Sequence, residues 1–84
     1  MASSYSENLW QTYDIALAAT LALWVPLNSI DRFDNRRSIF NFPSSNELGK
    51  LVTLYREGRL EVEPRAYFDE LRELKTRLHE GRSL

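Results

Sequence analysis

The segment Ile15–Leu27 restricts more than any other feature what this chain can fold into. It is apolar except for Thr20, and Pro26 stands near its end. A helix built from this segment is apolar on nearly every side, and such helices are buried in a core. It is too short for the ~20 residues that span a bilayer. The sequence therefore predicts a central core helix, starting from an N-cap at Thr12 and ending at about Trp24, because proline disfavours helical backbone in the residue before it.

The length of the whole chain, 84 residues, fits one domain built around that helix. Two Trp, four Tyr and four Phe supply large apolar areas for a small core. The chain has no cysteine, which excludes disulfides, thiolate catalysis and cysteine-ligated metals, and favours a reducing compartment, the cytoplasm. We expect a single domain over residues 9–80, a flexible N-terminal segment at 1–8 and a flexible tail at 81–84.

A β-hairpin is predicted directly after the core helix. Leu27–Phe33 and Arg36–Phe42 alternate between apolar and polar residues, and Asp34–Asn35 separates them. Asp and Asn tolerate the backbone conformations that a two-residue hairpin turn requires. Alternation places Phe40 and Phe42 toward the core.

Two further helices complete the predicted fold. Ser44 and Glu47 form the spacing of a capping box, Gly58 is a helix-ending glycine, and Pro64 suits the first turn of a last helix. The apolar stripe of that last helix comprises Tyr67, Phe68, Leu71, Leu74 and Leu78. With a short first strand at Leu9–Tyr13, the prediction is an α+β fold: a two- to three-stranded antiparallel sheet packed against three helices, in the order β-α-β-β-α-α.

Parts of the sequence resemble a small bacterial and phage-associated domain family of unknown function. The matching stretches are Thr12–Ile15, Ala18–Ala19, Ser29–Arg32, Arg36–Arg37, Phe40–Phe42, Gly58–Pro64, Tyr67–Phe68, Leu71 and Leu74–Lys75. The resemblance covers roughly residues 10–79. It implies a small stand-alone domain and brings no activity, ligand or catalytic residue.

The sequence lacks the usual equipment for catalysis. His79 is the single histidine and there is no cysteine, so an ordinary zinc site cannot form. The carboxylates of the C-terminal third alternate with arginines, which is typical of a solvated face. The chain has three glycines and no nucleophile motif. We therefore expect no enzyme, cofactor, metal, small-molecule substrate or membrane partner.

One binding hypothesis concerns the hairpin tip. Arginines and an aromatic at such a tip can contact phosphates and stack on a base; the candidates are Arg32, Phe33, Arg36 and Arg37. Lys50, Arg56 and Arg59 would extend this patch only if they lie on the same side. The alternative is a solvated turn in which Asp31 pairs with an arginine across the hairpin. The formal net charge of −1 provides no general attraction to nucleic acid.

The leading hypothesis is protein binding, with the chain itself as one possible partner. Trp10, Tyr13 and Trp24 gather in the N-terminal half, and a small core need not bury all of them. A small sheet also leaves open edges that another chain can pair with. This predicts an interaction module or a homodimer. The alternative is that every aromatic residue packs inside.

Overall fold

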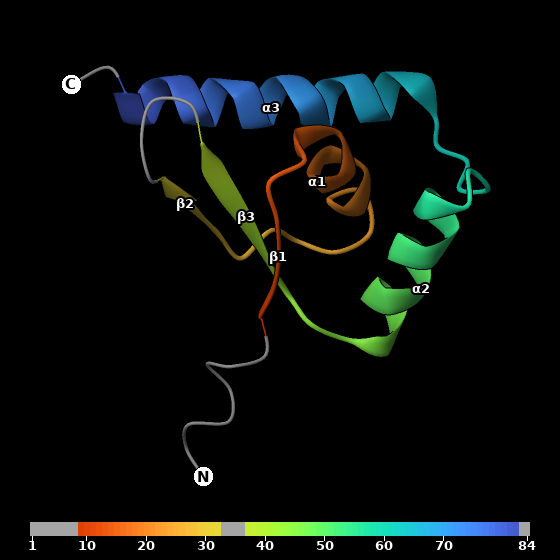
Figure 1. The fold of residues 1–84 in the computed structure, drawn as a ribbon. Helices are drawn as coiled ribbons and strands as arrows, with labels where there is room; N and C mark the ends of the chain where they lie inside the picture. Colours follow the sequence, from red (N-terminus) through yellow and green to blue (C-terminus); the bar gives the residue numbers. More distant parts are fainter. Residues whose placement is uncertain (1–8, 33–36, 83–84) are drawn as a thin grey trace, which may run out of the picture.

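Three strands and three helices follow one another in the predicted order, in a computed structural model that describes residues 9–32 and 37–82. The elements are β1 (Leu9–Thr12), α1 (Ile15–Leu21), β2 (Ser29–Arg32), β3 (Ser38–Pro43), α2 (Asn46–Arg56) and α3 (Pro64–Arg82) (Figure 1). The α+β fold class is confirmed. The predicted N-terminal segment 1–8 lies outside the described residues, and α3 continues through residues 81 and 82 of the predicted tail.

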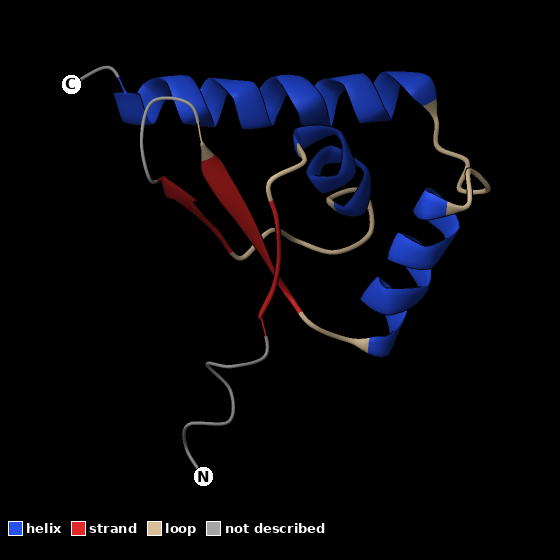
Figure 2. Ribbon diagram, viewed as in Figure 1, coloured by secondary structure: helices blue, strands red, loops and turns tan. Residues whose placement is uncertain are grey.

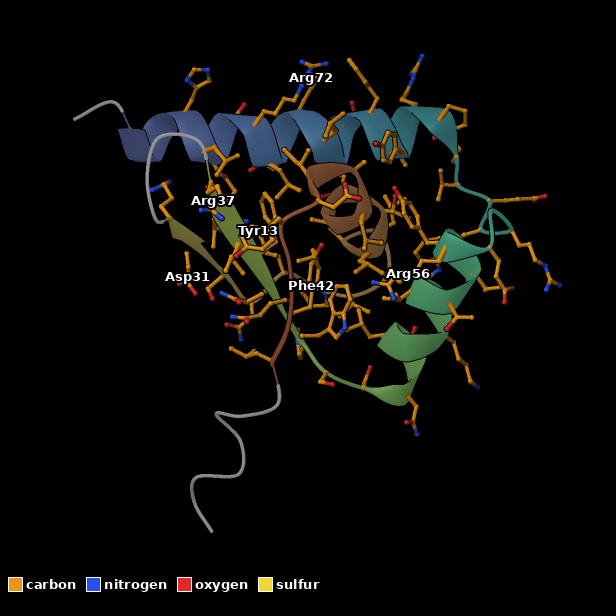
Figure 3. The ribbon with its side chains drawn as sticks, viewed as in Figure 1. Tyr13, Asp31, Arg37, Phe42, Arg56 and Arg72 are labelled. Atoms are coloured by element: carbon orange, nitrogen blue, oxygen red, sulfur yellow. The ribbon has the colours of Figure 1, made fainter. Side chains whose placement is uncertain are left out.

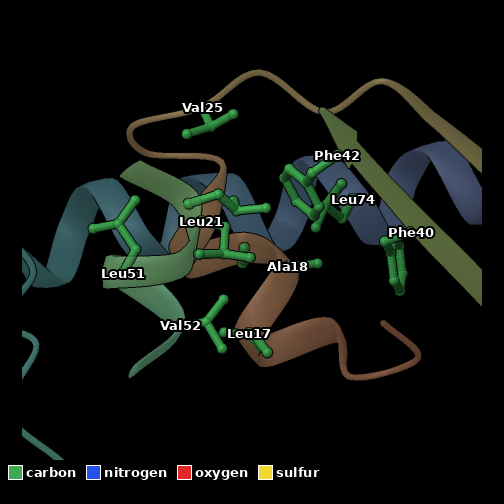
Figure 4. Packing of buried hydrophobic residues seen from close by; sticks show 11 residues of the cluster. Leu17, Ala18, Leu21, Val25, Phe40, Phe42, Leu51, Val52 and Leu74 are labelled. Carbon is green, nitrogen blue, oxygen red and sulfur yellow. The ribbon is translucent and has the colours of Figure 1, made fainter. Parts of the chain in front are cut away.

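Helix α1 occupies the centre of the molecule, as its all-round apolar surface predicts. Five consecutive residues, Leu17–Leu21, are buried. Helices α2 and α3 both pack on α1. Figure 4 shows α1 between the apolar residues of α2 and the phenylalanines of β3. The helix that is apolar on every side is therefore the one that contacts every other layer.

Both ends of α1 differ from the prediction. The N-cap is Asp14, whose Oδ1 accepts hydrogen bonds from the backbone N–H of Ala16 (2.9 Å) and Leu17 (3.2 Å). Thr12 is not the cap, because it pairs with Phe40 in the sheet. The helix ends at Leu21 rather than near Trp24. Its last carbonyls bond to the N–H groups of a tight turn over residues 23–25, which reverses the chain toward β2.

The sheet has the order β1-β3-β2, with both pairs antiparallel. Phe40 and Phe42 of the middle strand are 2% and 0% exposed, so the prediction that they face the core is confirmed. The predicted turn at Asp34–Asn35 lies outside the described residues. A two-residue turn there would pair Arg32 with Arg37, whereas the strands pair Arg32 with Ser38. The strand register therefore differs by one residue from the register that a two-residue turn would give.

Helix α2 begins one residue later than its sequence signal indicates. Its N-cap is Ser45, whose Oγ accepts a hydrogen bond from the Leu48 N–H (3.1 Å), so the capping box of Ser44 and Glu47 does not form. Burial of Leu48 inside the core fixes this phase of the helix. The end at Gly58 is confirmed: its φ is 72°, and the two closing hydrogen bonds of a Schellman motif follow it.

Helix α3 starts at Pro64, as predicted, with Glu63 before it accepting a hydrogen bond from the Ala66 N–H (2.7 Å). Leu74 is its fully buried contact with the core. Tyr67, Leu71 and Leu78 pack around that contact. Phe68, which was predicted to belong to this apolar stripe, is 53% exposed. It follows Tyr67 directly in the sequence and is therefore rotated away from the side of α3 that faces the core.

Candidate functional site

One face of the sheet is not covered by the helices. Side chains alternate along a strand, so Trp10, Ile30, Phe40 and Phe42 all face the helical core. The residues between them face the other way, away from the helices grouped beside the strands in Figure 2. We call this side the open face; it carries Leu9, Gln11, Tyr13, Asp31, Arg37, Ile39 and Asn41.

A polar network crosses the open face and joins all three strands. At its centre, Asn41 of β3 is 1% exposed. Its Oδ1 accepts a hydrogen bond from Gln11 Nε2 of β1 (2.8 Å). Its Nδ2 donates to Ser29 Oγ and Asp31 Oδ2 of β2, both at 3.0 Å. Sequence alternation placed Asn41 on this face but gave no sign of its burial, which depends on neighbours in two other strands.

Beside this network, an aromatic ring and a guanidinium group form one contact. The Arg37 Cζ lies 5.8 Å from the centre of the Tyr13 ring, within cation–π range. Figure 3 shows the two side chains next to each other across β1 and β3. Tyr13 is 58% exposed, and it shares a shallow hollow with Gln11, Thr12 and Ile39. The open face thus combines an exposed ring, an amide and a positive charge.

The structure separates the arginines that were predicted to act together. Arg32 and Arg37 are both exposed, but Arg32 has the parity of Ile30 on the helical side, whereas Arg37 contacts Tyr13 on the open face. Phe33 and Arg36 lie outside the described residues. The predicted extension through Lys50, Arg56 and Arg59 does not join this end: Figure 3 shows Arg56 on α2, well away from Arg37.

The predicted aromatic interface is also divided. Trp10 is half-buried on the helical side of β1, and Tyr13 is exposed on the open face. Trp24 is 44% exposed in the turn after α1. Tyr13 and Trp24 are thus at the surface, but the three candidate residues do not lie on one face of the sheet.

Two further surfaces lie on α2 and α3. A shallow, open depression lies on α2, lined by Ser45, Asn46, Gly49, Lys50, Thr53 and Leu54. On α3, the centre of the exposed Phe68 ring lies 5.6 Å from the guanidinium Cζ of Arg72. Neither surface combines polar groups from several elements, as the open face does.

Three elements meet at Tyr55. Burial raises the pKa of the Tyr55 hydroxyl, and the Asp14 carboxylate and the Tyr67 hydroxyl add to that rise. The protonated form of the Tyr55 hydroxyl is therefore favoured at the place where α2 lies near the starts of α1 and α3.

Within the described ranges, no three metal-ligating side chains come together. No helix in that same part of the chain is long and apolar enough to cross a bilayer.

Comparison with known proteins identifies the family. No curated protein and no solved structure matches the chain significantly. A family model described as a domain of unknown function (DUF5659) matches residues 7–80, which include every strand and nearly all of α3. The chain therefore belongs to the DUF5659 family, whose description assigns no function.

Proposed function

We propose that the domain is a non-enzymatic protein-interaction module that acts in the cytoplasm through the open face and the adjoining edge of β1. The observation that supports this most is the exposure of Tyr13 and Leu9, at 58% and 38%, on the face without helices. Large apolar side chains next to amide and guanidinium groups are typical of protein-binding surfaces. The polar network around Asn41 holds the three strands beneath them in a fixed arrangement.

The size of the open face indicates what kind of contact it makes. Three strands at ~4.8 Å spacing and at most six residues of ~3.3 Å each cover ~300 Å². A stable interface between globular proteins buries ~800 Å² on each partner. The open face alone is therefore large enough for an extended peptide segment of a partner. A larger interface forms only if the edge of the sheet also contacts that partner.

Site-specific photo-crosslinking tests this function. A photoreactive aromatic residue at position 13 in the full chain should form protein adducts in the cells that make the protein. The same residue at position 61, which is exposed in the loop between α2 and α3, should not form those adducts. Adducts that protease removes support the proposal. The absence of any adduct specific to position 13 would overturn it.

The Tyr13–Arg37 contact favours a second candidate, binding of single-stranded nucleic acid. A ring that stacks on a base beside an arginine that contacts phosphate is a known arrangement. Short DNA and RNA strands should then bind at low salt, and binding should weaken as salt rises. Arg37→Ala should reduce binding, while Arg59→Ala, in the loop beyond α2, should leave it unchanged. Position-13 adducts sensitive to nuclease would support this candidate instead, and no binding at low salt would end it.

A further inference from the structure

We propose that the outer edge of β1 pairs with β1 of a second copy of this chain, in antiparallel orientation, to form a continuous six-stranded sheet. This inference rests on the proposed protein-binding function and names its partner. Three observations support it: the direction of the main-chain groups of β1, the lack of a charged residue or a proline within β1 itself, and the complementarity of the edge to itself.

The main-chain groups of β1 can be assigned to its two edges from one hydrogen bond. The Asn28 N–H donates to the Asn41 carbonyl at 2.7 Å, so the main chain of Asn41 points toward β2. Because these groups alternate along a strand, those of Phe40 and Phe42 point toward β1. Their partners Thr12 and Trp10 therefore bond to β3, and the N–H and C=O groups of Leu9 and Gln11 point to the outer edge.

The two edges of the sheet differ in how they are protected. Natural edge strands are guarded by charges or proline, which oppose pairing with another chain. The exposed Asp31 and Arg32 guard β2 in this way. The sequence of β1, Leu-Trp-Gln-Thr, has neither a charge nor a proline. Strand addition is thus opposed at β2 and not at β1.

The β1 edge is also complementary to itself. A two-fold axis perpendicular to the sheet keeps both open faces on the same side, and only the residue at the axis lies opposite its own symmetry-related copy. With the axis at Gln11, the outward main-chain groups of the two Gln11 residues bond to each other. Leu9 then lies opposite Tyr13 of the second copy, twice over. These are the two exposed large apolar residues of the open face, so the pairing covers both of them.

The contact is short, which determines its strength. Five paired residues of ~3.4 Å span only ~17 Å, below the length that a standard interface needs. The dimer should therefore be weak, with a dissociation constant of ~0.1 mM. Sedimentation velocity from ~10 μM to ~1 mM covers the range in which such an equilibrium shifts.

Charge substitutions at the paired positions test both the edge and the register. Leu9→Lys and Tyr13→Glu should each weaken self-association about tenfold or more, since a charge then faces an apolar residue at both ends of the contact. Mixing the two variants should restore association above that of either alone, because one Lys–Glu pair and one Leu–Tyr pair then form. Phe68→Lys, an exposed substitution on α3, should leave association unchanged.

The outcomes separate this inference from the function on which it rests. A wild-type chain that stays monomeric at ~1 mM, or variants that fail to complement on mixing, overturns the β1 pairing. Far-UV circular dichroism on each variant checks that the fold is intact. If the position-13 crosslinks then join a different protein, the protein-binding function stands while the homodimer does not. Crosslinks to a second copy, together with complementation, support both.

Discussion

At the scale of single residues, the open face is organised by Asn41. A buried polar group is costly unless its hydrogen bonds are made, and here one amide satisfies its acceptor and both donors through Gln11, Ser29 and Asp31. No other residue type offers that combination of one acceptor and two donors at this length. The network therefore fixes which residues of β1 and β2 lie beside β3, and so positions Tyr13 at the end of β1.

Replacement of Asn41 tests this role. Asn41→Ala should reduce the free energy of unfolding by about 2 kcal/mol, since three hydrogen bonds and a buried side chain are lost. Gln11→Ala, which removes one bond at an exposed position, should cost about 0.5–1 kcal/mol. Urea denaturation measures both. Equal losses for the two variants would contradict a central role for Asn41.

The titration of Tyr55 should lower the free energy of unfolding at alkaline pH. Its pKa is raised in the folded chain by burial first, then by Asp14 and Tyr67, so the folded state holds the proton more tightly than the unfolded state does. Its contribution to stability is therefore complete below the ordinary tyrosine pKa of ~10 and is lost as pH rises through the folded value. Tyr55→Phe cannot titrate and should lose less stability than the wild type above pH ~10. Chemical denaturation at pH 8 to 11 measures the difference, and parallel curves would show that Tyr55 has no such role.

At the scale of elements, local sequence signals predicted where each helix lies, but packing against the core decided at which residue α1 and α2 begin. Ser44 and Ser45 are both acceptable N-caps, and Ser45 is used because it brings Leu48 into the core. Thr12 and Asp14 are likewise both acceptable, and Thr12 is drawn into the sheet. The C-terminal end of α2 is different: only Gly58 there has the left-handed backbone that the closing motif needs.

The two glycines of this region form a matched pair of substitutions. Gly58→Ala should cost about 1 kcal/mol, because its φ of 72° is strained for any side chain although no atom lies near the added Cβ. Gly49→Ala should stabilise the protein by about 0.5–1 kcal/mol, since it lies inside α2 with open space around it. Thermal unfolding of both variants gives the comparison. Shifts of the same sign would contradict the role assigned to Gly58.

At the scale of the whole molecule, α1 holds together parts that contact one another little. The sheet lies on one side of it, and α2 and α3 pack against it. Among the described residues, the helices cover one face of the three-stranded sheet and leave the opposite face uncovered, together with the edge of β1. The packing of α2 and α3 on α1, on one side of the sheet, thus stabilises the fold and also leaves the open face exposed.

The attachment of α3 depends on few buried side chains. Leu74→Ala should reduce the free energy of unfolding by about 3 kcal/mol, because it is 2% exposed and leaves a cavity between α3 and the core. Phe68→Ala, on the same helix but 53% exposed, should change it by no more than about 0.5 kcal/mol. Urea denaturation and hydrogen exchange across α3 test this. A larger effect at Phe68 would show that its ring carries part of the packing.

The sequence by itself determined the fold class, the central helix, the inward direction of Phe40 and Phe42 and the ends marked by Gly58 and Pro64. These features follow from local periodicity or from the backbone preference of one residue, so they can be derived without knowing what lies opposite. The number of aromatic residues suggested that some stay at the surface, but it did not decide between that outcome and complete burial.

Only the tertiary structure decided the strand register, the burial of Asn41, the exposure of Phe68 and the separation of Arg32 from Arg37. Each depends on side chains that are distant in sequence: Asn41 is buried because Gln11, Ser29 and Asp31 surround it. A shift of one residue in a strand reverses the face on which a side chain lies. Sequence alternation therefore gives two opposite faces, and long-range pairing decides which residues of the three strands share each one.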